Sequence, residues 1–420
     1  MNLRRLLLLT ILSGIHVHAN AQRIATFDVD VSRLPMDMSD IASIDLDQLT
    51  FLSDTILHLV EVDGIKRTEV PYQIEHGESR KLYWIVRSGP KTKKRTYELV
   101  QGVSPPSKET VKTTIENGGL VISTNSKKLL RYQFETMYPP SGVDTAYKRS
   151  GFIHPLWSPH GQVLTRIQPP DHYHHYGIWN PWTHVLFEGD TVDFWNIKGK
   201  QGTVRFANFT SITNGSVFGE YRALHEHVAF KKNGSEKIAL NEIQSVRIYN
   251  SGNPDYYVAD ITTTMNCASP SEVLLLEYRY GGLGWRTTEQ WDNKNSTVLT
   301  SEGKTRKDGD GSTARWCIVQ GTVDGENAGV VMMSYPTNYN YPEPLRIWPE
   351  NQYNRGDMFA NFSPTKNRDW LLKPGHDYTL KYRLLVFNGN MTKEKAESAW
   401  QQFSKSPIVT VTLNKSTGKK

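Results

Sequence analysis

The chain has 420 residues, of which 38% are hydrophobic and 22% are charged, a composition typical of a globular protein and not of a disordered or fibrous one. Its formal net charge of +6 is spread along the sequence without a dense basic stretch, which argues against a nucleic-acid-binding protein. Aromatic residues make up 11% of the chain, and we expect part of this aromatic surface to line a binding site.

The first 21 residues have the pattern of a secretory signal peptide. Arg4 and Arg5 precede the apolar run 6–15, and small residues precede a cleavage site after Ala21. We therefore expect cleavage after Ala21 and a periplasmic or secreted mature protein. The apolar run is too short to cross a bilayer and no later stretch approaches the required length, so no membrane span is expected.

Short apolar runs separated by turn residues dominate the rest of the chain. Residues 244–249 and 256–264 alternate between polar and apolar side chains, the pattern of half-buried strands. A helix is expected only near the end, from the N-cap Thr392 to about Phe403. Many strands, one late helix and no alternation of strands with helices predict an all-β fold built as an antiparallel sandwich.

A stretch rich in Pro and Ser, residues 101–107, separates two series of predicted strands. It predicts a small β-sandwich domain over residues 22–110 and a larger β domain over residues 115–405 that ends in the helix. The two cysteines, Cys267 and Cys317, can pair after export, but their spacing in the sequence leaves the pairing open. The oligomeric state is open as well.

Histidines concentrate in one region of the sequence. Six of the 13 histidines lie within a short stretch that also contains several Trp: His154, His160, His172, His174, His175 and His184. Pro169 and Pro170 preclude regular structure at its centre and begin a fixed loop before Asp171. If the chain then extends, His172 and His174 share one face and His175 points to the other.

Three interpretations of His172, His174 and His175 stay open. They can be acid–base catalysts, because imidazole titrates near neutral pH and Asp171 can orient one ring. They can bind a divalent metal, because histidines two positions apart on a strand, here His172 and His174, can chelate. They can also be packed core side chains. We carry the first interpretation forward, which requires no cofactor and makes His174 the central acid or base, and keep the metal as its alternative.

A glycine-containing segment, residues 277–286, carries a second group of candidate residues. Its spacing fits no phosphate-binding loop. We expect Glu277 and Arg279 to act with the histidines, Arg279 by stabilising negative charge and Glu277 by holding a hydroxyl group. Further Trp and Arg residues are expected to bind the substrate: Trp179, Trp182, Trp195, Trp285, Arg286, Arg315, Arg346 and Trp348.

Three segments resemble a bacterial family of unknown function that carries the label methane oxygenase PmoA-like. They are RSGFIHPLWSPHG (149–161), PDHYHHYGIW (170–179) and VDFW (192–195), within a resemblance that covers about residues 120–390. The Asp-His-x-His-His element is the most specific of these marks, although that family often has Pro and Arg in place of Tyr173 and Tyr176.

The resemblance implies an antiparallel β-supersandwich similar to galactose-mutarotase and polysaccharide-lyase domains, which are typical of exported sugar-utilisation proteins. It transfers no catalytic role to any residue. The activity in the label does not carry over, because that oxygenase is an integral membrane protein and this sequence contains no expected span.

Together these features predict an exported carbohydrate-active enzyme whose partner is a carbohydrate substrate. Trp faces can stack on sugar rings, and Arg, Glu and His can bond hydroxyl groups. Without a paired-carboxylate motif, histidine acid–base chemistry of the lyase or epimerase type fits the sequence better than classical hydrolysis. Two alternatives stay open, a non-catalytic glycan-binding protein and a histidine-dependent metalloenzyme.

Overall fold

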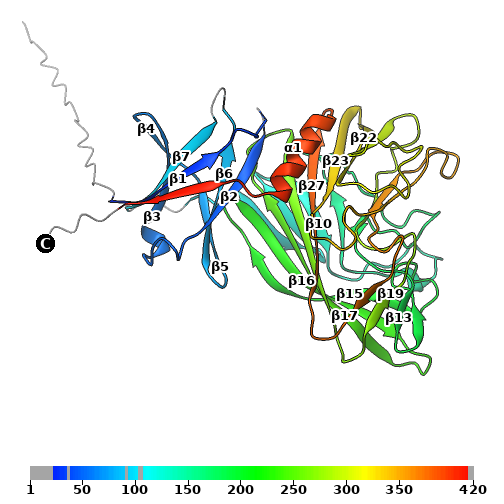
Figure 1. Ribbon diagram of the computed structural model, residues 1–420. Helices are drawn as coiled ribbons and strands as arrows, with labels where there is room; N and C mark the ends of the chain where they lie inside the picture. Colours follow the sequence, from blue (N-terminus) through cyan, green and yellow to red (C-terminus); the bar gives the residue numbers. More distant parts are fainter. Residues whose placement is uncertain (1–21, 36–37, 90–92, 103–106, 415–420) are drawn as a thin grey trace, which may run out of the picture.

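The computed structural model describes residues 22–35, 38–89, 93–102 and 107–414, and most of their regular structure is β-strand (Figure 1). The predicted signal peptide and part of the predicted linker lie outside these ranges. Within them the structure contains one α-helix, α1 (Lys393–Ser404), and two short 3-10 helices, η1 (Asp54–Ile56) and η2 (Thr145–Tyr147). The prediction of an all-β fold is confirmed.

Two small sheets form the N-terminal part of the molecule, drawn mainly in blue in Figure 1. The three-stranded sheet contains, in spatial order, β2 (Ser39–Asp45), β6 (Arg80–Arg87) and β5 (Tyr72–His76). The five-stranded sheet contains β28 (Val409–Leu413), β1 (Gln22–Asp30), β7 (Lys94–Gln101), β3 (Leu57–Asp63) and β4 (Lys66–Glu69). Alternate side chains of β1 and β6 are buried between them, because successive residues of a strand point to opposite faces. Phe27 stacks on Trp84 there, with ring centroids 5.6 Å apart.

The strand β28 returns from near the end of the chain to pair with β1, and Figure 1 shows it in red beside the blue strands. Ala25 is paired with Leu413 and Val29 with Val409. Sequence analysis did not predict this strand, since it ended the larger domain at residue 405. The five-stranded sheet therefore contains strands from both ends of the described chain. The division of the chain into two domains stays a proposal.

Two eight-stranded antiparallel sheets form the larger part of the molecule, with a four-stranded sheet at one end. The first contains β24 (Leu345–Ile347), β25 (Phe359–Phe362), β20 (Gly284–Arg286), β12 (Ile178–Trp179), β11 (Phe152–Leu156), β10 (Lys127–Gln133), β9 (Gly119–Thr124) and β8 (Val111–Glu116). The second contains β15 (Gly202–Thr213), β16 (Phe218–Phe230), β17 (Glu236–Tyr249), β18 (Tyr256–Cys267), β27 (Tyr378–Asn388), β23 (Glu326–Ser334), β22 (Trp316–Val323) and β21 (Ser296–Thr300). The four-stranded sheet contains β14 (Asp190–Val192), β13 (Val185–Phe187), β19 (Val273–Leu275) and β26 (Trp370–Leu372).

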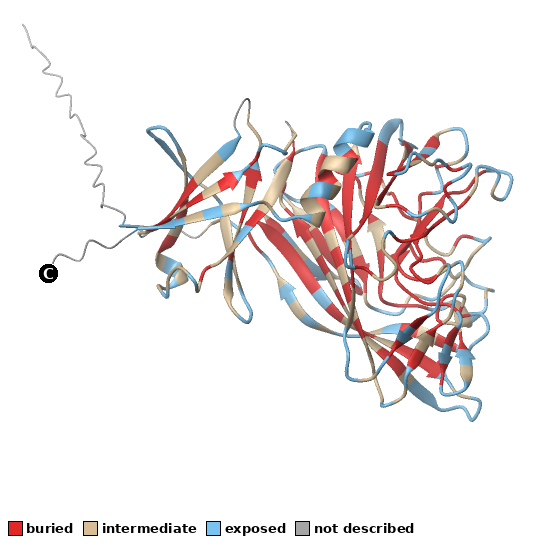
Figure 2. Cartoon of the chain, in the orientation of Figure 1, coloured by how far each residue is buried: buried red, intermediate tan, exposed pale blue. Residues whose placement is uncertain are grey.

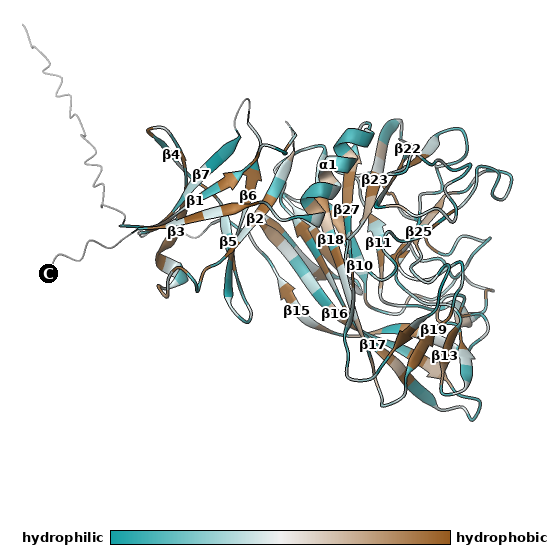
Figure 3. Cartoon of the chain, in the orientation of Figure 1, coloured by the Kyte–Doolittle hydropathy of each residue, from teal (hydrophilic) through white to brown (hydrophobic). Residues whose placement is uncertain are grey.

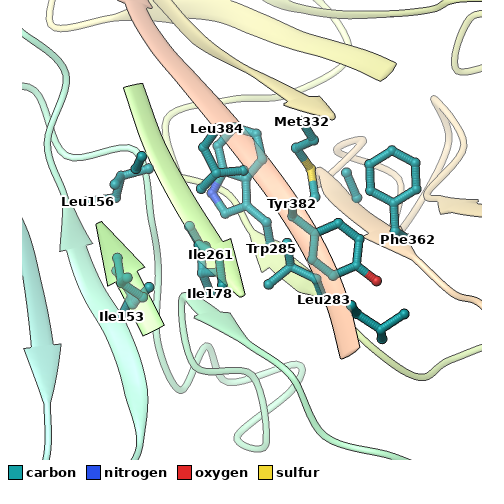
Figure 4. Packing of buried hydrophobic residues seen from close by; sticks show 14 of the residues in the cluster. Ile153, Leu156, Ile178, Ile261, Leu283, Trp285, Met332, Phe362, Tyr382 and Leu384 are labelled. Carbon is teal, nitrogen blue, oxygen red and sulfur yellow. The ribbon is translucent and has the colours of Figure 1, made fainter. Parts of the chain in front are cut away.

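The largest hydrophobic core lies between the two eight-stranded sheets (Figure 4). Ile153 and Trp285 enter it from the first sheet, and Ile261 and Leu384 enter it from the second. Many buried residues, red in Figure 2, and many apolar residues, brown in Figure 3, lie on these strands. Two antiparallel sheets that enclose one core are a β-sandwich, which confirms the predicted architecture.

The helix α1 connects β27 to β28 and packs on β22 and β23. The side-chain oxygen of Thr392 accepts a hydrogen bond from the backbone N–H of Lys395, which caps the first turn. Ala396 and Ala399 are the buried residues of this helix. The predicted position of this helix is confirmed. Throughout the described ranges, no helix has the length and apolar character that crossing a membrane requires.

The two cysteines are both free thiols in the described structure. Cys317 is buried on β22, and burial raises the pKa of its thiol to about 12. Cys267 lies on β18 and its thiol donates to the carbonyl of Leu372 at 3.4 Å. The sequence left the pairing of the two cysteines open; in the structure they lie on separate strands and form no disulfide with each other.

Candidate functional site

The three neighbouring histidines lie in a turn that leads into β12, and their rings face one another. The backbone N–H of His172 donates to the carbonyl of Pro169 at 2.8 Å, and that of His175 donates to the carbonyl of His172 at 3.0 Å. The turn brings ring nitrogens of His172, His174 and His175 within 4.8 Å of one another. The expectation that His175 points away from the other two is wrong, because this segment turns and does not extend.

Two side-chain contacts hold the imidazole of His172. Its Nδ1 lies 2.9 Å from Oδ2 of Asp171, and its Nε2 lies 3.0 Å from the hydroxyl of Tyr353. The ring also packs against Trp348, with centroids 5.1 Å apart. An ionised carboxylate can only accept, so Nδ1–H of His172 donates to Asp171, and in the neutral imidazole the lone pair is then on Nε2.

A chain of alternating charges holds Asp171 in turn. Arg286, from β20, donates through Nη2 to Asp171 at 3.0 Å and to Asp357 at 2.8 Å. Asp357 also accepts from Nε of Arg355 at 2.7 Å. Burial alone would raise the pKa of Asp171, but the hydrogen bond with His172 and the charge of Arg286 lower it to about 2. Asp171 is therefore ionised at neutral pH.

The other two imidazoles are desolvated. Burial, followed by the neighbouring imidazole of His172 and the guanidinium of Arg149, lowers the pKa of His174 to about 3. Burial and the neighbouring imidazoles lower the pKa of His175 well below its usual value. Among the described residues, no hydrogen-bond partner reaches the buried Nδ1 of His175. Both rings are neutral at neutral pH, the form in which histidine offers a lone pair to a metal ion.

The predicted tryptophans form the wall behind the histidines. His175 packs against Trp179 and Trp348, with ring centroids 5.2 and 5.6 Å apart. The five predicted indoles, none more than 1% exposed, are Trp179, Trp182, Trp195, Trp285 and Trp348. An indole this buried offers no face to a ligand. The expectation that these residues stack on a sugar is therefore corrected: Trp182 and Trp285 fill the core between the sheets, and the others support the histidine turn.

Tyrosines, and not tryptophans, provide the accessible aromatic surface beside the histidines. Tyr353 is 49% exposed, and Tyr147 and Tyr173 pack on one another with centroids 5.7 Å apart. The hydroxyl of Tyr280 accepts from Nε1 of Trp348 at 3.1 Å, which places this ring beside the same wall. None of these tyrosines was predicted as a site residue, because isolated Tyr residues carry no spacing signal.

Two of the predicted arginines connect to this site. Arg286 is at its centre, with its guanidinium carbon 4.6 Å from the ring centroid of Trp348. Arg346 reaches the site indirectly, since it donates to the hydroxyl of Tyr280 at 3.3 Å. It also forms an ion pair with Asp310 at 2.8 Å. Arg286 therefore contacts Trp348 directly, and Arg346 reaches it through Tyr280.

Three other predicted residues are not joined to the histidines. Glu277 and Arg279 are exposed, and the backbone N–H of Glu277 donates to Asp369 at 2.6 Å. The guanidinium of Arg279 lies over the ring of Tyr280, 5.4 Å from its centroid, at the margin of the site. Arg315 belongs to another part of the molecule, where it pairs with Glu397 of α1 at 3.2 Å. Within the described ranges, no contact with the histidines supports the direct catalytic roles expected for Glu277 and Arg279.

A family model described as "Family of unknown function (DUF6807)" matches residues 119–401, which is more than half of the chain. The chain belongs to this family. The DUF6807 region begins and ends close to the limits of the resemblance found in the sequence, although its description does not carry the PmoA-like label. The histidine turn, Arg286, Tyr353 and Asp357 all lie within the DUF6807 region.

A search of curated proteins finds no match. Two solved structures are similar at low identity. A protein in the glycosyl hydrolase family 38 from Enterococcus faecalis is 8% identical with a TM-score of 0.46, and the match covers 94% of this chain and 48% of that one. A galactose mutarotase related enzyme from Lactobacillus acidophilus is 9% identical with a TM-score of 0.31, covering 67% and 98%. The chain spans about half the length of the first of these.

Proposed function

We propose that this DUF6807 protein is a metal-dependent enzyme that acts on a carbohydrate, with His172, His174 and His175 as metal ligands. The observation that carries the proposal is the convergence of three imidazoles whose nitrogens lie within 4.8 Å of one another. One of these nitrogens, Nδ1 of His175, is buried without a hydrogen-bond partner among the described residues, which costs free energy that a bound cation would offset. The proposal takes up the metal alternative in place of the expected absence of a cofactor, and adds His175 to the two ligands predicted.

Three protein nitrogens leave a coordination position open, as in catalytic and not structural zinc sites. Imidazole ligands suit zinc, copper, iron or nickel better than calcium or magnesium. Asp171 would hold the ring of His172 through Nδ1, in the manner of the carboxylate partners of metal-binding histidines. Arg286 and Asp357 would fix Asp171 in turn. When bound, the metal would supply Lewis-acid activation of an oxygen atom of the substrate or of water.

A carbohydrate is the substrate class that suits the rim of this site. The rings of Tyr173, Tyr280 and Tyr353 offer apolar faces, while Arg279 and Asp310 offer donors and acceptors for hydroxyl groups. Polarisation of a carbonyl or carboxylate oxygen of the substrate would acidify the C–H bond next to that group, so lyase or epimerase chemistry remains the proposed reaction type. Export to the periplasm or the medium, predicted from the first residues, is part of this proposal.

One observation favours a second candidate function, which is acid–base catalysis without metal. The pair of Asp171 and His172 has the geometry of a general base, with an ionised carboxylate on Nδ1 and a lone pair on Nε2. In this case His172 would be the base, in place of His174 as the sequence suggested, because His172 is the ring that a carboxylate orients.

The test is a glycan-library screen of the purified protein with product analysis, run before and after chelation. We expect chelation to abolish activity and one added transition metal to restore it. His174→Ala should fold normally and lose both metal and activity. His160→Ala is the matched control, because His160 pairs with Glu326 at the surface at 2.9 Å, and it should keep both. Activity that survives chelation but falls in Asp171→Asn would establish the second candidate, and a screen without any glycan product would refute the carbohydrate assignment.

A further inference from the structure

A polar groove begins beside the histidine site and runs away from it. It consists of two adjoining hollows of about 560 and 480 Å³. The two hollows share four lining residues: Arg166, Pro170, Glu289 and Gln290. One hollow reaches Asp171 and Asp357, and the other continues to His154 and Asp324. The near end of the groove is therefore lined by Asp171, the carboxylate that holds His172.

Hydrogen bonds within its own walls position the polar side chains of the groove. The guanidinium of Arg166 lies 3.3 Å from the carboxylate of Glu289. The side chain of Gln290 donates to Asp324 at 2.8 Å and accepts from its backbone N–H at 3.0 Å. Arg355 donates to the carbonyl of Glu289 at 2.5 Å. The groove thus presents guanidinium, amide and carboxylate groups that hydrogen bonds hold against one another.

Planar groups of this kind suit the recognition of neighbouring hydroxyl groups, because each can make two hydrogen bonds at once. Pro169 and Pro170 add a rigid apolar edge on which the C–H face of a sugar can lie. Each hollow falls within the range of roughly 300–1,000 Å³ for pockets that enclose a drug-sized ligand, so together they exceed the needs of a single sugar ring. A peptide fits less well, since peptide grooves use a free sheet edge or apolar pockets.

We infer that this groove binds the sugar residues next to the one at the histidines, so that the substrate is an oligosaccharide or polysaccharide chain and not a free monosaccharide. The inference rests on the proposed carbohydrate function. It assigns a binding role to Arg166, Glu289, Gln290 and Asp324, which the sequence did not single out.

Calorimetric titration of the protein as purified, without removal of metal, tests the inference. The probes are oligosaccharide ladders, from the monosaccharide to the hexasaccharide, prepared from neutral and uronic-acid polysaccharides. We expect affinity to rise roughly tenfold or more along a ladder that binds, the effect of two or three added hydrogen bonds. Arg166→Ala and Gln290→Ala should each remove most of this gain and leave the affinity for the monosaccharide unchanged.

Arg315→Ala is the matched control, because it breaks an arginine–glutamate pair of similar length, 3.2 Å, against α1. It should leave the gain with chain length intact, and thermal melts should show that all three variants fold. Affinity that does not change with chain length would overturn the inference that the groove binds further sugar residues, but would not contradict the proposed function. Failure of every saccharide, of any length, to bind would overturn both the groove and the carbohydrate assignment, while the metal content of the protein would still test the histidine site separately.

Discussion

The hydroxyl of Tyr353 lies 3.0 Å from Nε2 of His172, although 181 positions separate the two residues in the sequence. Tyr353 belongs to the loop between β24 and β25, and its backbone has a φ of 52°. A non-glycine residue at positive φ carries strain of roughly 1–3 kcal/mol, which the surrounding contacts must overcome. Its ring packs on Trp348 at 5.3 Å. Tyr353 therefore covers the one nitrogen of His172 that remains for a metal.

Replacement of this tyrosine should separate metal binding from turnover. In Tyr353→Phe we expect the metal content to stay unchanged, because three histidines remain, and kcat to fall about 10²-fold, because a donor beside the open position is lost. Metal analysis and steady-state kinetics measure the two effects. Tyr138→Phe, at a tyrosine that is 61% exposed, should change neither. Loss of the metal in Tyr353→Phe would mean that the phenol is itself a ligand.

Asp171 should tune the affinity for metal without binding it. Asp171→Asn removes the charge that holds Nδ1–H of His172, so we expect the metal affinity to fall about 10–100-fold, the usual effect of losing such a partner. Competition with a chelator of known affinity measures the change. Asp324→Asn, which alters a carboxylate in the groove bonded to Gln290, should bind metal as the wild type does. Equal metal affinities in the two variants would show that Asp171 does not tune metal binding.

Much of this site could be predicted because its central residues are neighbours in the sequence. His172, His174 and His175 stand out by their local density, which requires no knowledge of the fold. Asp357 and Tyr353 could not be found in this way. They come from a distant loop that reaches the histidine turn only because β24 and β25 lie beside β20 and β12 in one sheet.

The burial of the tryptophans could not be predicted from the sequence either. An indole near a histidine cluster is as suitable for the core as for a binding surface, and only the packing of Trp179 and Trp348 behind His175 decides between them. The strands were predictable from their period of two. The partner of β28 was not, because pairing with β1 joins segments almost 400 residues apart.

Trp348 should couple stability to metal binding. Its ring packs on His172, His175 and Arg286, so Trp348→Phe should lower the free energy of unfolding by about 1–3 kcal/mol and also weaken metal binding. Trp291→Phe is the matched control, since Trp291 is just as buried but lies in the core against Trp285. It should lose similar stability and keep the metal affinity. Denaturant unfolding and metal titration of both variants measure this difference, and an equal loss of affinity would contradict it.

Buried Glu343 should give the protein a pH-dependent stability. Its carboxyl group accepts from Ser334 at 2.6 Å, Asn338 at 2.7 Å and Tyr382 at 2.9 Å, and burial raises its pKa to about 7 from an ordinary value of 4.5. Folding thus favours the protonated form. The stabilising contribution is complete below about pH 4.5 and is lost as the pH rises to about 7.

Denaturant unfolding across this pH window measures the contribution of Glu343. We expect the free energy of unfolding of the wild type to fall by up to about 1.4 kcal/mol per pH unit, and Glu343→Gln to remove this slope. Glu350→Gln, at an exposed position, should retain it. Parallel pH profiles for the wild type and Glu343→Gln would show that this carboxyl group does not titrate in the window.

Titration of the metal-depleted protein with Co²⁺ tests the three-histidine centre most directly. We expect the wild type to bind a single equivalent, and His172→Ala, His174→Ala and His175→Ala each to lose that binding while remaining folded. His160→Ala, altered outside the cluster, should bind as the wild type does. A folded wild-type protein that binds no Co²⁺, or undiminished binding in the three histidine variants, would contradict the account.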